Sequence, residues 1–326
     1  MKFQLETPKA VVDAKNAKKG MNWALELLLF VGIFLLASIG QGIILFPIEL
    51  VLLLTNPAYM SAVESGDMTL ITEASMGVAN SSGYMIGMLF ANIGMIFVVM
   101  LFCKLVQKRK MSSLGFVKKD MGKEYGIGLI VGFAIFSAAV LICVLTGSLK
   151  MEGFSETFSV VPFILFALGF MIQGMAEEVL CRSYFMVSMA RRSPIWVAVL
   201  LNSLFFAALH LTNPGMSVLA FINLTLFGVF ASVYFVKRGS IWGIGAIHSI
   251  WNFVQGNFYG VKVSGMETSC SVFESVAVEG RDLVSGGAFG LEGGIAVTIV
   301  LVVGILFLLS RPAKETEEVV VESQAA

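Results

Sequence analysis

Two adjacent carboxylates lie inside a long apolar run of this chain, together with an arginine. Residues 174–182 read GMAEEVLCR. On an α-helix Glu178 and Arg182 are four residues apart and can form an ion pair, whereas Glu177 points about 100° away from Glu178. The spacing therefore predicts that Arg182 keeps Glu178 ionised, and that Glu177 faces another helix as a candidate general base.

The only two histidines of the chain also lie in or at the end of apolar runs. His210 ends the run FFAALH, and His248 begins the run HSIWN, which places Asn252 four residues later on the same helix face. A carboxylate and a histidine can deprotonate and orient a water molecule, and a His/Asn pair can stabilise an oxyanion. Together these segments predict hydrolysis of a carbonyl compound.

These three segments resemble the motifs of the CAAX protease and bacteriocin-processing family of intramembrane endopeptidases, also called CPBP or Abi. The family pattern is EExxxR, FxxxH and HxxxN or HxxxD on successive membrane helices. The matching residues, within about residues 160–260, are Glu177, Glu178 and Arg182, then Phe206 and His210, then His248 and Asn252.

The resemblance implies a glutamate-dependent peptidase in which Glu177 and His210 activate water. It implies that His248 and Asn252 form the oxyanion hole, and that the supporting residues are Glu178, Arg182 and Phe206. The family usually has an aromatic residue and a glycine around the arginine of the first motif, where this chain has the packing residues Cys181 and Ser183.

The resemblance also implies a peptide or membrane-anchored protein as substrate, with lipidation left open. Some relatives trim prenylated C-terminal motifs, whereas others are tied to bacteriocin processing and self-immunity, and nothing in the sequence selects between these roles. The family favours access to the site from the cytoplasmic side, although the sequence itself leaves the access face open.

Three other interpretations of the same residues are kept as alternatives. Glu177, His210 and His248 could converge on a zinc ion, although no HExxH motif is present and no cofactor is expected. The protein could be a proton-coupled secondary transporter, because intramembrane carboxylates and histidines relay protons. It could also be a non-catalytic immunity or scaffold protein that keeps the family fold, in which a buried Glu/Arg pair only sets helix registry.

The composition places these residues in a membrane. The chain has 326 residues, of which 57% are hydrophobic and 13% charged, and its mean hydropathy is +0.87. A soluble domain carries about 25% charged residues, and a net charge of zero gives no basic field for nucleic acid. We expect an all-α polytopic bundle of about eight spans, at roughly 22–46, 83–106, 125–147, 158–182, 195–211, 217–236, 241–259 and 288–310.

The distribution of Lys and Arg predicts the orientation of these spans. Of the 22 Lys and Arg residues, 18 lie in the N-terminal segment, in every second loop and in the C-terminal tail, three lie in the loops between, and Arg182 lies inside a span. Because cytoplasmic loops carry the excess of basic residues, we expect a multi-pass cell-membrane protein with both termini in the cytoplasm.

This topology divides the chain into five segments. They are a cytoplasmic basic leader (1–21), N-terminal transmembrane helices (22–157), a CPBP-like catalytic core (158–260), an outer loop and last span (261–310), and an acidic cytoplasmic tail (311–326). At 1.5 Å per residue, His210 lies about 24 Å along its helix from Pro194, whereas His248 lies about 14 Å from Gly239. The two histidines can meet only if their helices are offset or tilted.

Overall fold

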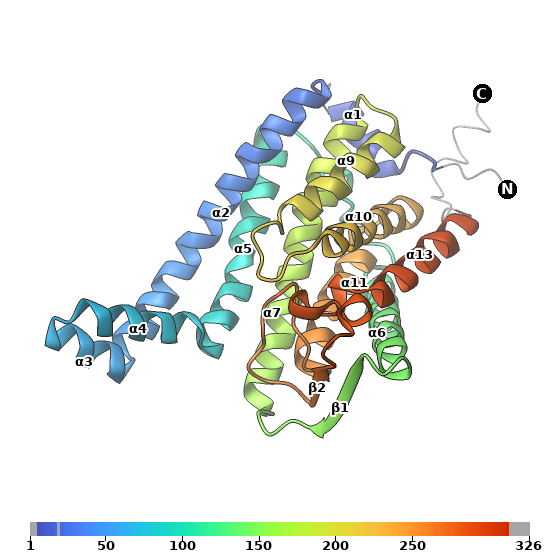
Figure 1. Cartoon of the computed structure of the whole chain (residues 1–326). Helices are drawn as coiled ribbons and strands as arrows, with labels where there is room; N and C mark the ends of the chain where they lie inside the picture. The colour runs from blue at the N-terminus through green and yellow to red at the C-terminus, as the bar shows by residue number, and fades with distance from the viewer. Residues whose placement is uncertain (1–4, 18–19, 313–326) are drawn as a thin grey trace, which may run out of the picture.

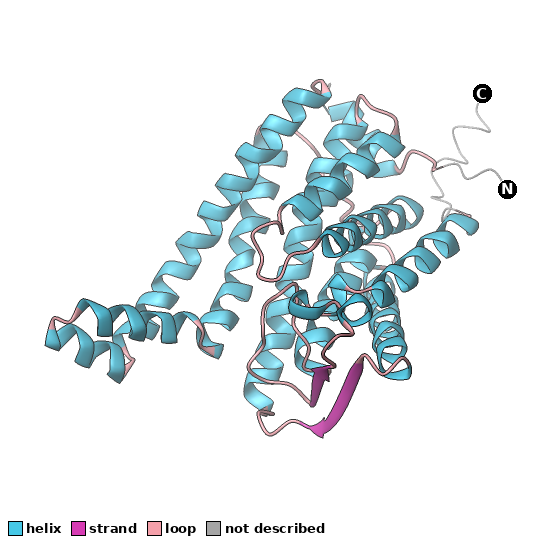
Figure 2. Cartoon of the chain, viewed as in Figure 1, coloured by secondary structure: helices cyan, strands magenta, loops and turns pink. Residues whose placement is uncertain are grey.

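The computed structural model describes residues 5–17 and 20–312, and these are almost entirely helical (Figures 1 and 2). The all-α membrane bundle expected from the sequence is confirmed. Most of the acidic tail expected at 311–326, and residues 1–4 and 18–19 of the basic leader, lie outside the described residues.

Each of the eight expected spans corresponds to a helix. Five helices are long and apolar enough to cross a membrane: α2 (Trp23–Leu54), α5 (Ser82–Leu105), α6 (Met121–Leu145), the continuous helix Val160–Ala190, and α10 (Val218–Arg238). The other three are shorter, namely α9 (Ile195–Ala208), α11 (Ile241–Phe253) and α13 (Ile295–Ser310).

The long helix Val160–Ala190 consists of three parts. It begins as α7 (Val160–Glu178), continues as the π-helix η2 (Val179–Met186) and ends as α8 (Val187–Ala190). A second π-helix, η3 (Val254–Phe258), follows α11 directly. Both π segments therefore begin within two residues of a motif residue, as is frequent at functional sites.

The remaining elements are short. In the leader, α1 (Lys9–Ala17) buries one face, and η1 (Met111–Leu114) lies between α5 and α6. Helices α3 (Pro57–Ser65) and α4 (Met68–Ala79) project from the far end of α2 (Figure 1). Strands β1 (Leu149–Phe154) and β2 (Phe273–Ala277) pair antiparallel, and the segments that precede α13 are α12 (Asp282–Ser285), η4 (Gly287–Phe289) and η5 (Leu291–Gly293).

One end of the bundle collects the basic residues, and we call it the basic end. Glu26 at the start of α2 pairs with Arg191 after α8, at 2.9 Å between Oε1 and Nη2. Arg238 at the end of α10 donates from Nε to Glu124 at the start of α6, at 3.0 Å. Of the described Lys and Arg residues, this end holds Lys9, Lys15, Lys104, Lys108, Arg109, Lys110, Lys118, Lys119, Lys123, Arg191, Arg192, Lys237, Arg238 and Arg311.

The opposite end consists of α3, α4, the β1–β2 pair and the segment 259–294, and we call it the loop end (Figure 1). The Ser82 hydroxyl at the start of α5 lies 2.6 Å from that of Ser269, which ties the α5 start to this end. Among the described residues the loop end carries only three cations, Lys150, Lys262 and Arg281.

The packing is densest where the long helix approaches the basic end. Every residue from Val179 to Ala190 is buried. Arg109, in the loop after α5, donates from Nη2 to the Ser183 carbonyl at 2.7 Å, and Ser183 Oγ donates to the Leu114 carbonyl at 2.6 Å. Burial lowers the pKa of Arg109 to about 10, so the guanidinium is charged at neutral pH. These bonds fasten η2 to the loop between α5 and α6.

Candidate active site

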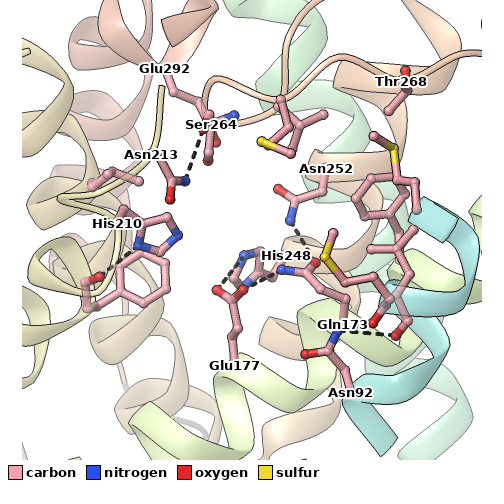
Figure 3. Close-up of a pocket in the computed structure, with 18 of the residues that line it drawn as sticks. Asn92, Gln173, Glu177, His210, Asn213, His248, Asn252, Ser264, Thr268 and Glu292 are labelled. Carbon is pink, nitrogen blue, oxygen red and sulfur yellow. Dashed lines mark hydrogen bonds and ion pairs between the residues drawn. The ribbon is translucent and has the colours of Figure 1, made fainter. Parts of the chain in front are cut away.

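Five of the residues singled out in the sequence line one cavity of about 280 Å³, namely four catalytic candidates and the supporting residue Phe206 of α9. Glu177 comes from α7, His248 and Asn252 come from α11, and His210 lies in the turn after α9 (Figure 3). Because α9 ends at Ala208, His210 is part of this turn and reaches the same cavity as His248. The two histidines therefore line the same cavity, although they lie at different distances along their helices.

A glycine allows α7 and α11 to approach closely beside His248. A Cβ atom on Gly174 would lie 2.6 Å from the backbone nitrogen of Ser249, a distance that real Cβ atoms do not adopt. Ser249 Oγ also lies 3.2 Å from the Met171 carbonyl of α7. The carboxylates of α7 therefore face His248 across a tight backbone contact.

Glu178 and Arg182 do not line this cavity and lie behind it. Both side chains are completely buried, and Arg182 Nη1 lies 3.0 Å from Glu178 Oε1. Within the described chain no guanidinium nitrogen of Arg182 makes a well-directed hydrogen bond. The guanidinium instead forms the ion pair with Glu178 and lies over the Phe206 ring, 4.5 Å from its centroid. The pair thus supports Phe206 from behind, and the same Glu178 Oε1 accepts a 2.8 Å hydrogen bond from His248 Nδ1.

The hydrogen bonds of the two histidines define which nitrogen of each ring faces the cavity. His210 Nδ1 lies 2.9 Å from the Phe206 carbonyl. Because a carbonyl only accepts, Nδ1 carries the proton and Nε2 is left as an acceptor. In His248, Nδ1 donates to Glu178, and Nε2 faces Glu177 Oε2 at 3.7 Å. Each ring is therefore oriented by one partner and presents the other nitrogen to the cavity.

Gln173 belongs to the site although the motif analysis did not include it. It lies one helical turn before Glu177 and donates from Nε2 to Glu177 Oε1. Its Oε1 accepts a hydrogen bond from Asn252 Nδ2 at 2.9 Å. Gln173 thus links the candidate base on α7 to the candidate oxyanion donor on α11 (Figure 3). Its signal in the sequence was a polar residue in an apolar run, four residues before Glu177.

A turn at residues 263–266 covers the cavity from the loop end. Ser264 donates from its backbone nitrogen and from Oγ to Glu292 Oε2, both at 2.7 Å. Trp251 Nε1 donates to Glu292 Oε1 at 3.1 Å, and Asn213 Nδ2 donates to the Ser264 carbonyl at 3.0 Å. Glu292 is buried and is the second carboxylate that lines the cavity, after Glu177, and no sequence motif marked it. We call residues 263–266 the roof turn.

The opposite wall comes from the N-terminal helices, outside the region of the three motifs. One face of α5 contributes residues at helical spacing, and α2 contributes Gln41; the α5 residues are Met85, Met88, Leu89, Asn92 and Met95. Methionine side chains are flexible and adapt to differently shaped apolar groups. The cavity therefore combines a polar side, which holds the catalytic candidates, with an adaptable apolar side.

One alternative considered from the sequence was a zinc ion held by Glu177, His210 and His248. Within residues 5–17 and 20–312, no three or more His, Cys, Asp or Glu side chains are grouped so that they could hold a metal ion. Glu177, His210 and His248 share the cavity without forming such a group.

The comparison with protein families gives one match. Residues 159–254 match the family described as type II CAAX prenyl endopeptidase Rce1-like. The matched segment contains all seven residues of the three motifs, from Glu177 to Asn252. No curated protein and no solved structure matches the chain.

Proposed function

We propose that this chain, of which residues 159–254 match the CAAX prenyl endopeptidase family, hydrolyses a peptide bond with water activated by Glu177 and His210. The observation that carries the proposal is that Glu177, His210, His248 and Asn252 line one cavity. A peptidase active site needs a base, donors for the oxyanion and room for water. In this proposal the side chains around the cavity provide the base and the donors, and the cavity itself holds the water.

The first step is the attack of water on the substrate carbonyl. His210 Nε2, oriented by the bond from Nδ1 to the Phe206 carbonyl, accepts one hydrogen bond from the water. Glu177 takes the proton as the water oxygen bonds to the carbonyl carbon. The Glu177 side chain is 21% exposed and lines the cavity, whereas that of Glu178 is completely buried behind it, so of the two carboxylates Glu177 is the one that faces water in the cavity.

The second requirement is a donor for the oxyanion that forms at the carbonyl oxygen. The Asn252 amide has two N–H groups; one donates to Gln173, and the other is left for the oxyanion. His248 donates through Nε2 when both ring nitrogens carry protons. In that state the positive charges of His248 and Arg182 match the negative charges of Glu177 and Glu178, which limits the cost of burying them.

The reaction ends when the tetrahedral intermediate collapses. The C–N bond breaks, and the proton held by Glu177 moves to the leaving nitrogen. The products are one new carboxyl terminus and one new amino terminus, and the side chains return to their starting states. Gln173 keeps Glu177 and Asn252 in register throughout, because it bonds to both of them.

The experiment compares protein termini in membranes of cells that carry either the wild-type protein or Glu177→Gln at equal abundance. We expect new peptide ends only with the wild type. A matched control is Glu152→Gln, which changes an exposed carboxylate on β1 and is expected to leave the termini as in the wild type. Equal termini with wild type and Glu177→Gln would reject the peptidase. Substrate flux through liposomes containing the protein would then support the transporter.

A further inference from the structure

We propose that Glu292 is a positioning residue for the hydrolysis, because its carboxylate supports two parts of the catalytic site that lie on different segments. The inference rests on the proposed peptidase function and adds a residue to it. Glu292 lies in η5 and lines the cavity, outside residues 159–254 that match the endopeptidase family. From its carboxylate, one series of contacts leads to His210 and another leads to the helix of His248 and Asn252.

The Glu292 carboxylate accepts three hydrogen bonds from two segments that are far apart in the sequence. Oε2 accepts from the backbone nitrogen and from Oγ of Ser264, both at 2.7 Å. Oε1 accepts from Trp251 Nε1 at 3.1 Å. Because Glu292 is only 7% exposed, these donors take the place of water around the buried charge. Hydrogen bonds to a charged group are roughly twice as strong as those between neutral groups, so both segments are held firmly.

The backbone of Glu292 is itself fixed by two helices. The buried Asn223 of α10 donates from Nδ2 to the carbonyls of Glu292 and Gly294, both at 2.8 Å. Thr298 of α13 donates from Oγ1 to Asn223 Oδ1 at 2.6 Å, which orients the amide. The carboxylate of Glu292 therefore projects from a segment that is anchored to α10 and α13.

The first series of contacts leads through the roof turn to His210 (Figure 3). The Ser264 carbonyl accepts a hydrogen bond from Asn213 Nδ2 at 3.0 Å, and the Asn213 backbone nitrogen donates to the His210 carbonyl at 3.0 Å. Since His210 lies beyond the end of α9, its backbone is not fixed by a helix at this point. The position of the turn therefore decides where His210 Nε2 points.

The roof turn and the turn of His210 are also in direct backbone contact. A Cβ atom on Gly265 would lie 2.1 Å from the Pro214 carbonyl oxygen, which is far too close for any side chain. Gly265 also has a φ of +89°, a conformation that favours glycine. A shift of the roof turn away from Glu292 would thus displace the segment that follows His210.

The second series of contacts leads through Trp251 to α11. The Trp251 ring is buried, and its centroid lies 5.5 Å from that of Phe227, whose ring in turn lies 4.9 Å from that of His248. On α11, Trp251 comes three residues after His248 and one before Asn252. A bond that fixes Trp251 about the helix axis therefore also fixes the directions of His248 and Asn252.

Both series of contacts require an acceptor at residue 292. The Trp251 Nε1–H and the Ser264 backbone N–H can only donate, and a carboxylate offers an oxygen to each of them. A glutamine side chain has the same shape but only one acceptor oxygen, so it can accept from one of the two segments and faces the other with a donor. Glu292→Gln therefore breaks one connection without a change in size.

The first measurement is steady-state cleavage by Glu292→Gln, with rates divided by the concentration of folded protein. We expect kcat to fall about 10-fold, as for the loss of one hydrogen bond to a charged group, with KM little changed. The matched control is Glu279→Gln, which changes an exposed carboxylate just after β2 and should leave both constants at their wild-type values.

The second measurement needs no turnover and uses the fact that the chain has only two histidines. In protein labelled with isotopes at histidine, NMR spectra show one set of ring signals for His210 and one for His248, assigned with His210→Ala. Trp251→Phe should shift the signals of His248 and leave those of His210 in place. Asn213→Ala should do the reverse, and Glu292→Gln should shift at least one set.

A purely structural role for Glu292 predicts a different result. Glu292→Gln would then lower the melting temperature, while the folded fraction kept wild-type kcat and wild-type histidine signals, and that outcome would overturn the proposal. Unchanged signals of both histidines in Trp251→Phe and Asn213→Ala would overturn it as well. If the signals shift as expected while cleavage does not depend on Glu177, the peptidase function fails and the support of the two histidines by Glu292 stands.

Discussion

The two halves of the long helix Val160–Ala190 differ sharply in their surroundings. Residues of its first half, such as Val160, Val161 and Ile164, are more than half exposed on the outside of the bundle. Every residue from Val179 onward is buried. The adjacent carboxylates Glu177 and Glu178 lie at the boundary, the first open to the cavity and the second enclosed by protein.

The difference indicates that neighbouring positions of one helix have two different roles, structural support and contact with the cavity. The buried half provides a rigid support, because a fully buried ion pair is costly to break. The cavity side provides polar groups that are free to meet water and substrate. Substitutions in the support should therefore reduce stability, and substitutions on the cavity side should reduce turnover and leave stability unchanged.

The largest effect is expected in the support. Arg182→Met leaves Glu178 as an unpaired buried charge and should lower the free energy of unfolding by about 3–5 kcal/mol. Denaturation of the purified protein in detergent measures this change. The double variant Glu178→Gln/Arg182→Met removes both charges and should recover much of the loss. A single variant as stable as the wild type would show that the pair is not a support.

On the cavity side, His210→Ala should reduce turnover by roughly 10²–10⁴-fold, the usual contribution of a general acid–base group. The melting temperature should stay unchanged, because His210 lies in a turn and its side chain hydrogen-bonds only to the Phe206 carbonyl among the described residues. Cleavage rates and melting curves of the same preparation test both statements. A variant that melts early and cleaves normally would place His210 in the support.

Asn252→Ala should reduce turnover by roughly 10²–10³-fold, the cost of removing one oxyanion donor. Because the effect is on the transition state, kcat should fall while KM changes little. Steady-state kinetics with a cleavable peptide distinguish the two constants. A rise in KM at constant kcat would assign Asn252 to substrate binding.

A smaller effect is expected for Gln173→Leu, which removes the link between Glu177 and Asn252. We expect kcat to fall about 10-fold, corresponding to about one hydrogen bond to a charged group, with KM unchanged. If Gln173 acts through Asn252, the double variant Gln173→Leu/Asn252→Ala should be little worse than Asn252→Ala alone. Fully additive losses would contradict this positioning role.

The smallest effect is expected from metal removal. Dialysis against EDTA or phenanthroline should leave the cleavage rate unchanged, because the proposed steps use side chains and water only. Loss of activity that Zn²⁺ restores would favour the alternative in which Glu177, His210 and His248 hold a metal ion.

Much of this arrangement could be predicted from the sequence because its signals are local. Apolar runs mark helices, and residues four apart on one run share a face, which connects Glu178 with Arg182 and His248 with Asn252. The same rule could have found Gln173, four residues before Glu177. The family resemblance then grouped the three segments, and the structure places their catalytic candidates around one cavity.

Other features could not be predicted, because they depend on contacts between distant segments. Asn213, Ser264 and Glu292 meet at the roof turn, yet they come from three separate loops with no periodic pattern. The methionines of α5 look the same in the sequence as methionines that only pack between helices. The bonds that fasten the π-helix η2 also have no local signal, since they connect Ser183 with Arg109 and Leu114 in another loop.

The most direct test compares Glu177→Gln with Glu178→Gln, using cleavage rate and melting temperature of each purified protein. The two substitutions are chemically identical and one residue apart. We predict that Glu177→Gln loses cleavage and keeps the wild-type melting temperature, whereas Glu178→Gln melts at a clearly lower temperature. Normal cleavage by Glu177→Gln, or a lowered melting temperature for it alone, would contradict the assignment of Glu177 as the base and Glu178 as its support.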